Sequence, residues 1–388
     1  MPPCNRHQSR HWRALAALSV FSWAGLTAAQ ECDQTSIGAT PLSDLGSGLY
    51  LGLFQGGLYP GGVNVMPAAH HVLAVERGEL MQPLNAAGMP DPAGKVILLS
   101  IGMSNATQEF SRFKIEASDH PAVNVESLRI VDGAKSGETA DRWDSPADLN
   151  YDRVRDEVLA SIGLSEAQVQ VAWVKVANRQ PSASLPAFDA DAYILQRQLG
   201  DIVRAMKTRY PNLRQVYLSS RIYAGYATTT LNPEPYAYES GFAVKWVVEA
   251  QIEQAAGGGA NPIAGELDPA TTPWIGWGPY LWADGLIPRS DGLTWQCTDL
   301  SVDGTHPTSP GRAKVADLML SFFLTSSMSR TWFRAGPIGD TNLDGLVDVA
   351  DLLELLASWG DCDPCIEDFD ADGVVGVFDL LLLLGSWG

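Results

Sequence analysis

The pattern of apolar and polar positions between about residue 45 and residue 333 alternates short hydrophobic runs with longer amphipathic stretches. Four runs rich in β-branched residues predict strands, at residues 95–101, 127–131, 169–176 and 215–219. Strands that alternate with helices along the chain build a parallel sheet with helices on both faces. The pattern therefore predicts a three-layer α/β/α sandwich.

Two helices give the clearest signals. Ser309 is predicted as an N-cap, Pro310 as the first helical residue, and apolar residues follow at helical spacing, at Val315, Leu318, Met319, Phe322 and Phe323. A second amphipathic run leads from Tyr193 to Met206 and into the strand at Gln215.

The first 29 residues follow a different pattern. Arginines precede an apolar run over residues 14–26, and Thr27-Ala28-Ala29 follows it. This pattern is typical of a secretory signal peptide that is cut after Ala29. The run is too short to span a bilayer, which takes about 20 apolar residues, and no later stretch is long enough. We therefore expect a secreted, extracellular protein without a membrane span.

Export makes disulfides possible. Once Cys4 is removed with the signal peptide, four cysteines remain, Cys32, Cys297, Cys362 and Cys365. Of the three possible pairings, Cys32 with Cys297 and Cys362 with Cys365 fits proximity best. A zinc site is the alternative for the Cys-x-x-Cys pair, but no second such pair or nearby histidine completes it.

The net charge of −19 is concentrated near the C-terminus, where twelve acidic residues and no lysine or arginine follow position 335. A chain without a basic stripe is a poor partner for the phosphate backbone, so we expect no nucleic-acid binding. A local cluster of acidic residues indicates cation binding instead.

The acidic segment is a tandem repeat with a period of 28 residues, which aligns Asp340 with Asp368 and Trp359 with Trp387 without a gap. Each copy places oxygen side chains at loop positions 1, 3, 5 and 12, a glycine at position 6 and a backbone carbonyl at position 7. Loops of this kind bind calcium. The predicted ligands of two calcium ions are Asp340, Asn342, Asp344, Leu346, Asp348 and Asp351 in the first copy, and Asp368, Asp370, Asp372, Val374 and Asp379 in the second.

An apolar helix follows each loop, no separate helix precedes it, and its twelfth ligand is aspartate. In these respects residues 338–388 resemble a type I dockerin, a small all-α, EF-hand-like calcium module that docks to a cohesin. That family often has a Ser-Thr pair at loop positions 10 and 11, where this chain has Val349-Ala350 and Val377-Phe378. Because these two positions help to select the cohesin in that family, the resemblance does not extend to recognition of a standard cohesin. The alternative is a calcium-stabilised tail with no partner.

The candidate chemistry of the larger part of the chain involves three residues. Ser104 directly follows the first strong strand, and Asp303 stands three positions before His306, just ahead of a helix. A serine with a histidine as general base and an acid to orient that histidine is the arrangement of nucleophilic acyl transfer.

A serine near the start and an Asp-x-x-His near the end of the domain resemble the SGNH (GDSL-like) hydrolase family over about residues 95–325. The resemblance implies a flavodoxin-like sandwich for a domain at 30–335, an ester hydrolase activity, and no cofactor for catalysis. It also implies an oxyanion hole made by the Ser104 N–H, Gly137 and Asn178. Met103 departs from the family, which usually has aspartate before the serine.

Together these features lead us to expect a secreted serine esterase that removes O-acyl groups, above all O-acetyl groups, from carbohydrate. The alternatives are a broad esterase or lipase for small esters, and a catalytically silent protein that binds glycans or acts as a scaffold. Five aromatics between Trp274 and Trp295 either offer faces to sugar rings or are buried in the core. Arg221 either meets an anionic substrate or pairs with an acid on the surface.

Overall fold

The computed structural model describes residues 31–361, 366–370 and 373–388. The predicted signal peptide, the Cys362 and Cys365 pair and the predicted ligand Asp372 lie outside the described residues. Among the described helices, none is both long enough and apolar enough to cross a membrane.

The larger domain is built on a five-stranded sheet in which all neighbouring strands are parallel, in the order β4-β3-β5-β6-β7. Every residue of β3 and β5 is buried, as expected for strands that are covered on both faces. In chain order the strands run 2-1-3-4-5, which is the flavodoxin-like arrangement. The strands are β3 (Val96–Gly102), β4 (Leu128–Asp132), β5 (Val169–Lys175), β6 (Gln215–Leu218) and β7 (Trp274–Trp277).

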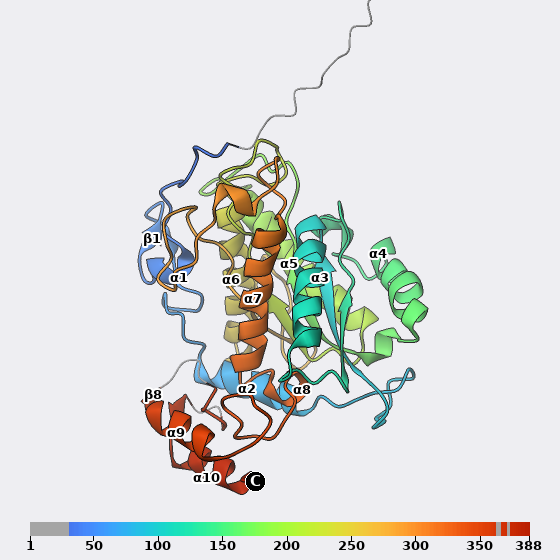
Figure 1. Cartoon of the computed structure of the whole chain (residues 1–388). Helices are drawn as coiled ribbons and strands as arrows, with labels where there is room; N and C mark the ends of the chain where they lie inside the picture. The colour runs from blue at the N-terminus through green and yellow to red at the C-terminus, as the bar shows by residue number, and fades with distance from the viewer. Residues whose placement is uncertain (1–30, 362–365, 371–372) are drawn as a thin grey trace, which may run out of the picture.

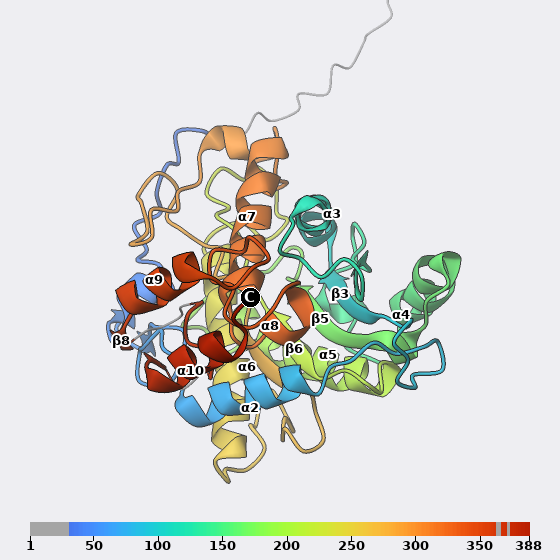
Figure 2. The ribbon, with the colours of Figure 1, turned by 60° about the horizontal axis from the view of Figure 1, so that its bottom comes forward.

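Helices cover both faces of this sheet. The long helices α3 (Ser104–Asp119) and α7 (Ser309–Thr325) lie side by side on one face, and α5 (Asp191–Arg209) and α6 (Tyr236–Ala255) pack together on the other, as Figures 1 and 2 show. The predicted three-layer sandwich is therefore present.

Shorter elements complete the domain. Two two-residue strands, β1 (Leu49–Tyr50) and β2 (Phe54–Gln55), pair antiparallel. The remaining helical segments are α1 (Leu42–Leu45), α2 (Ala68–Glu79), α4 (Leu149–Arg153) and α8 (Arg330–Phe333), with single turns or short π- and 3₁₀-segments at η1 (Ala140–Arg142), η2 (Val154–Leu159), η3 (Ala160–Ile162), η4 (Glu166–Gln168) and η5 (Cys297–Asp299).

The four predicted strands are confirmed to within one residue at each end. The sequence pattern does not predict the fifth strand, β7, because its short tryptophan-rich run fits a binding or core cluster equally well. The aromatics between Trp274 and Trp295 are buried, so the core interpretation is the correct one. The predicted N-cap at Ser309 is wrong by one residue. Thr308 has the extended backbone of an N-cap, and α7 begins at Ser309 with Pro310 in its first turn.

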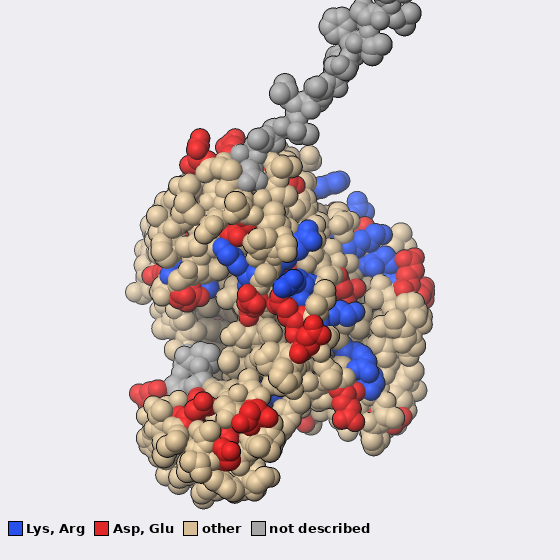
Figure 3. Space-filling view, in the orientation of Figure 1, with Lys and Arg blue, Asp and Glu red and all other residues tan. Residues whose placement is uncertain are grey.

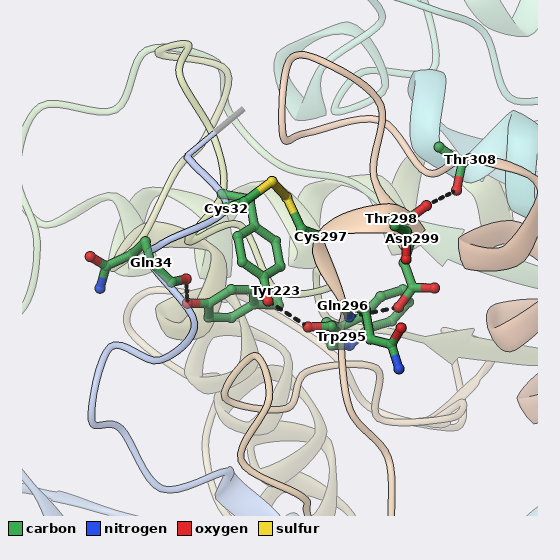
Figure 4. The surroundings of a disulfide bond; sticks show 10 residues. Cys32, Gln34, Tyr223, Trp295, Gln296, Cys297, Thr298, Asp299 and Thr308 are labelled. Carbon is green, nitrogen blue, oxygen red and sulfur yellow. Dashed lines mark hydrogen bonds between the residues drawn. A yellow bond between two sulfur atoms is a disulfide. The ribbon is translucent and has the colours of Figure 1, made fainter. Parts of the chain in front are cut away.

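A disulfide joins Cys32 to Cys297 across 265 residues of sequence. Figure 4 shows it holding the N-terminal segment beside the turn η5. Two further contacts fix the same segment, because the Tyr223 hydroxyl donates to the Gln34 carbonyl at 2.7 Å and the Glu31 N–H donates to the Tyr226 carbonyl at 3.1 Å.

The C-terminal tail packs below the domain in Figure 1 and has a small core of its own, formed by Val347, Leu355, Phe369, Val375 and Leu383. Its helices α9 (Val349–Ala357) and α10 (Val377–Gly385) follow the two loops. The tail is not purely helical, because the chain leaving α9 pairs with the second loop as β8 (Gly360–Asp361) and β9 (Val374–Val375). Figure 3 shows acidic side chains over the tail, while the larger domain displays both signs of charge.

Candidate active site

The candidate catalytic residues gather at the carboxyl ends of the central strands. Ser104 begins α3 directly after β3, and Asn178 lies three residues after β5. Because β3 is flanked by β4 on one side and β5 on the other, the chain turns in opposite directions after β3 and β5. In open α/β sheets this switch point is where ligands bind.

Ser104, His306 and Asp303 form one chain of hydrogen bonds. The Ser104 Oγ lies 2.8 Å from His306 Nε2, and His306 Nδ1 lies 2.5 Å from Asp303 Oδ2. A neutral imidazole with its proton on Nδ1 donates to the aspartate and leaves Nε2 free to accept the serine proton. The structure thus brings together three side chains that the sequence separates by about 200 residues.

The second carboxylate oxygen of Asp303 is fully occupied. Its Oδ1 accepts from the Ser301 hydroxyl at 2.7 Å and from the backbone N–H groups of Thr305 and His306 at 3.0 Å each. Partial burial raises the pKa of Asp303, but these hydrogen bonds and the His306 contact outweigh it, so the pKa lies well below its ordinary value. These contacts therefore favour the ionised form of Asp303 beside the imidazole.

The loop that carries the acid and the base is held against the helix of the nucleophile. The buried amide of Asn105 donates to the Thr305 carbonyl at 3.0 Å. Gly304 has a φ of +63°, and a Cβ there would lie 1.8 Å from the Tyr226 carbonyl oxygen. Only glycine fits this close turn. Sequence reasoning missed Asn105, whose role is visible only once α3 and the loop are side by side.

A cavity of about 340 Å³ opens at Ser104 and His306. The backbone N–H of Ser104 lies in the first turn of α3, where amide groups have no acceptor within the helix. Gly137 lies on the cavity wall, and within the described residues its N–H donates to no other group. The residues that line the cavity are Met103, Ser104, Asn105, Gln108, Ser136, Gly137, Asn178, Arg179, Leu231, Thr305 and His306.

Asn178 also lines this cavity, but its side-chain amide is engaged elsewhere. Its Nδ2 donates to Asp191 Oδ1 at 3.1 Å and to Gln198 Oε1 at 2.9 Å, which uses both amide hydrogens. In this arrangement Asn178 has no hydrogen left for an oxyanion. The two donors that the geometry leaves available are the N–H groups of Ser104 and Gly137.

Buried charges lie beneath the site. Lys175, the last residue of β5, and Glu109 on α3 form an ion pair at 2.6 Å inside the protein. Burial raises the pKa of Glu109 and lowers that of Lys175, and their mutual attraction acts against both shifts. Arg221 is only 1% exposed, and none of its guanidinium nitrogens has a hydrogen-bond partner within the described residues. Both predictions for Arg221 are therefore wrong, because it lies neither in the cavity nor on the surface.

In the tail, the described ligand residues of the second loop lie close together. Carboxylate oxygens of Asp368, Asp370 and Asp379 are all within 4.8 Å of one another. In the first loop, Asp340 accepts from the N–H groups of Asp344 and Gly345, and Asp351 accepts from those of Thr341, Asn342 and Asp348. Three oxygens at this spacing fit a hard cation, which prefers oxygen ligands.

No protein-family model and no curated protein matches the sequence. Among solved structures, the chain is similar to one described as a GDSL-like lipase from Parabacteroides merdae, with 12% identity, a TM-score of 0.34, and coverage of 61% of this chain and 96% of that one. A GDSL-like lipase from Bacteroides thetaiotaomicron gives 13% identity, a TM-score of 0.31, and coverage of 66% and 95%. An extracellular lipase from Streptomyces rimosus gives 14%, 0.30, and coverage of 58% and 99%. Likeness of this size decides nothing about chemistry, which rests on the side chains of the site.

Proposed function

We propose that the protein is a secreted serine ester hydrolase of the SGNH (GDSL-like) type that removes O-acyl groups, acetyl above all, from carbohydrate. The observation that carries the proposal is the continuous chain Ser104, His306, Asp303, with contacts of 2.8 and 2.5 Å. Nothing about a silent scaffold would require a serine at a helix N-terminus to face a histidine that is oriented by an ionised acid.

The reaction follows from this geometry. His306 Nε2 takes the proton of the Ser104 hydroxyl as its oxygen attacks the ester carbonyl. The charge that develops on the carbonyl oxygen is stabilised by the N–H groups of Ser104 and Gly137. His306 then passes the proton to the leaving alcohol. A water, deprotonated by the same imidazole, then attacks the acyl-enzyme, and the imidazolium returns its proton to the Ser104 Oγ as the acid leaves. Asp303 stabilises the imidazolium in both steps.

Labelling with a fluorophosphonate tests the activated serine, since only a nucleophilic serine reacts. We expect rapid labelling of the wild type and none of Ser104→Ala, with the same pattern for release of acetate from acetylated xylan or p-nitrophenyl acetate. Equal labelling of Ser104→Ala would exclude the proposal. Ser118→Ala, which removes an exposed hydroxyl near the opposite end of α3 from Ser104, is the matched control and should label like the wild type.

For the tail we propose two calcium sites and a role as a dockerin-like docking module. When bound, calcium would supply the positive charge that the loop carboxylates need in order to lie together. Isothermal titration should show two sites, and Asp340→Ala combined with Asp368→Ala should abolish both. Calcium binding that survives in this double variant would contradict the ligand assignment.

A protein partner for the tail is supported by the apolar surface of its helices. Leu353 on α9 and Phe378 and Leu381 on α10 are more than half exposed. Exposed apolar residues on two helices that pack together are typical of docking surfaces. Immobilised cohesin-type modules should bind the protein in calcium and release it in chelator, and failure to bind any such module would leave the tail as a stabilised C-terminus only.

A further inference from the structure

A second cavity of about 340 Å³ adjoins the cavity of the triad. The two cavities share Asn178 and Arg179 in their linings, so they lie side by side. Volumes of this size lie at the low end of small-molecule sites, which span about 300–1,000 Å³. The residues that line the second cavity are Thr139, Asp141, Asn178, Arg179, Gln180, Pro181, Ser182, Ala183, Asp189, Asp191 and Ile194.

The wall between the two cavities is fixed by hydrogen bonds. The Asn178 amide is held by Asp191 at 3.1 Å and by Gln198 at 2.9 Å, and the Asn178 carbonyl accepts from the side chain of Asn232 at 3.0 Å. Asp191 and Gln198 belong to α5, and Asn232 belongs to the loop before α6. The cavity is therefore shaped before any ligand arrives, which lowers the entropic cost of binding.

Two charged side chains on this wall are available to a ligand. Within the described residues, the side chains of Arg179 and Asp189 form no ion pair or hydrogen bond, and both residues are exposed. Phe188, next to Asp189 in the chain, is 93% exposed. A carboxylate accepts from hydroxyl groups, a guanidinium donates to hydroxyl and ring oxygens, and an aromatic face suits the C–H surface of a sugar.

The two cavities differ in chemistry. Around Ser104, Met103 and Leu231 supply apolar walls, whereas the second cavity adds three carboxylic acids to the Arg179 guanidinium that both cavities share. An ester has two halves, and a small acyl group suits the first cavity while a polyhydroxy alcohol suits the second. An apolar alcohol would take these polar groups out of water and would offer no hydrogen bonds in place of the ones that water made.

We propose that the second cavity is the subsite for the sugar ring that carries the ester, with Arg179 and Asp189 as its specificity-determining residues. The inference rests on the proposed function, since it assigns the alcohol half of that substrate. Arg179 and Asp189 carry opposite charges, and Asp141 lies 3.6 Å from the Arg142 guanidinium, so the exposed charges largely cancel. This balance favours a neutral sugar over a uronate.

The test compares p-nitrophenyl acetate, which has no sugar, with acetylated xylo-oligosaccharides and acetylated galacturonan oligosaccharides. Asp189→Ala and Arg179→Gln are made in the full chain. Asp119→Ala is the matched control, because it removes the same charge from an exposed position at the opposite end of α3 from Ser104. Thermal unfolding shows whether each variant is folded.

We expect the wild type to prefer the neutral oligosaccharide, and each site variant to lower kcat/KM for it about tenfold or more relative to p-nitrophenyl acetate, through a higher KM. The control should keep the wild-type ratio of kcat/KM for the oligosaccharide to kcat/KM for p-nitrophenyl acetate. The subsite proposal is overturned if both site variants keep this ratio, or if the wild type prefers the galacturonan oligosaccharide. Hydrolysis of p-nitrophenyl acetate by Ser104→Ala at the wild-type rate would instead overturn the proposed function itself.

Discussion

Asp303 orients His306 through one oxygen while three donors hold the other. Replacing it with asparagine keeps the size of the side chain but offers an N–H group to His306 Nδ1. Nδ1 then accepts instead of donating, so the imidazole carries its proton on Nε2 and cannot take the serine proton there. We expect Asp303→Asn to lower kcat for p-nitrophenyl acetate by roughly 10³- to 10⁴-fold with little change in KM.

Ser301→Ala is the comparison for this variant, because it removes one donor to Asp303 without touching the imidazole. It should cost about tenfold or less, in keeping with one lost hydrogen bond to a charged group. If Asp303→Asn keeps more than a tenth of the wild-type kcat, Asp303 is not the residue that orients His306.

Gly137 has a φ of +84° in open space, so an added methyl group would meet no neighbour but would strain the backbone by about 1–2 kcal/mol. Relief of that strain would turn its N–H away from the triad cavity. Losing an oxyanion donor costs about 10²- to 10³-fold, so a displaced donor in Gly137→Ala should lower kcat by up to about 10²-fold.

Gly163 is the matched position for Gly137, since its φ is +72° and its surroundings are equally open, but it caps η3 and lines neither cavity. Urea denaturation should show a similar loss of stability for Gly163→Ala and Gly137→Ala. A kcat that falls equally in both variants would mean that strain, rather than the oxyanion hole, explains the effect.

At the scale of elements, the disulfide connects the N-terminal segment to the turn that precedes the catalytic loop. Cys297 lies in η5, and from this turn the Asp299 carbonyl accepts the Thr308 N–H at 2.8 Å, two residues after His306. We expect Cys32→Ser combined with Cys297→Ser to lower the free energy of unfolding in urea by about 2–4 kcal/mol.

Dithiothreitol provides the control for the disulfide variant. It should destabilise the wild type by a similar amount, and any response that remains in the double variant then belongs to the other cysteines. Equal unfolding midpoints for the double variant and the oxidised wild type would show that the disulfide contributes nothing to stability.

The strands also show how much of the fold a local sequence pattern can predict. Strands β3 and β5 were predictable because buried parallel strands read as continuous apolar runs, as in Val96–Gly102. The strand Trp274–Trp277 could not be predicted, because a run of four residues rich in tryptophan has the same sequence pattern as any buried aromatic cluster. Its place at the edge of the sheet depends on pairing with β6, which is 56 residues earlier in the chain.

At the scale of the whole molecule, His70 links stability to pH. It is 3% exposed, its Nε2 lies 2.9 Å from the Ile275 carbonyl, and its Nδ1 has no partner within the described residues. Burial lowers its pKa to about 4, although the bond to Ile275 acts in the opposite direction. The folded protein therefore resists a proton that the unfolded chain accepts at about pH 6.5.

The contribution of a neutral His70 is complete above pH 6.5 and is lost as the pH falls towards 4, by about 3 kcal/mol over that interval. His70→Gln can still donate to the Ile275 carbonyl but does not titrate, so its urea stability should fall less steeply with acid than that of the wild type. If the free energy of unfolding falls with acid equally steeply in His70→Gln and in the wild type, His70 is not the cause of the pH dependence.

The sequence by itself determined the layer architecture, the candidate triad residues and the two acidic loops of the tail. Each of these depends on local periodicity, or on residue types at fixed spacing such as Asp303 and His306. Tertiary structure alone decided that Asn178 is bound to α5, that Arg221 is buried, and that a polar cavity lies beside the cavity of Ser104. These features arise where segments from distant parts of the chain meet. Which hydrogen bonds a side chain makes there depends on packing, and no spacing within one segment encodes it.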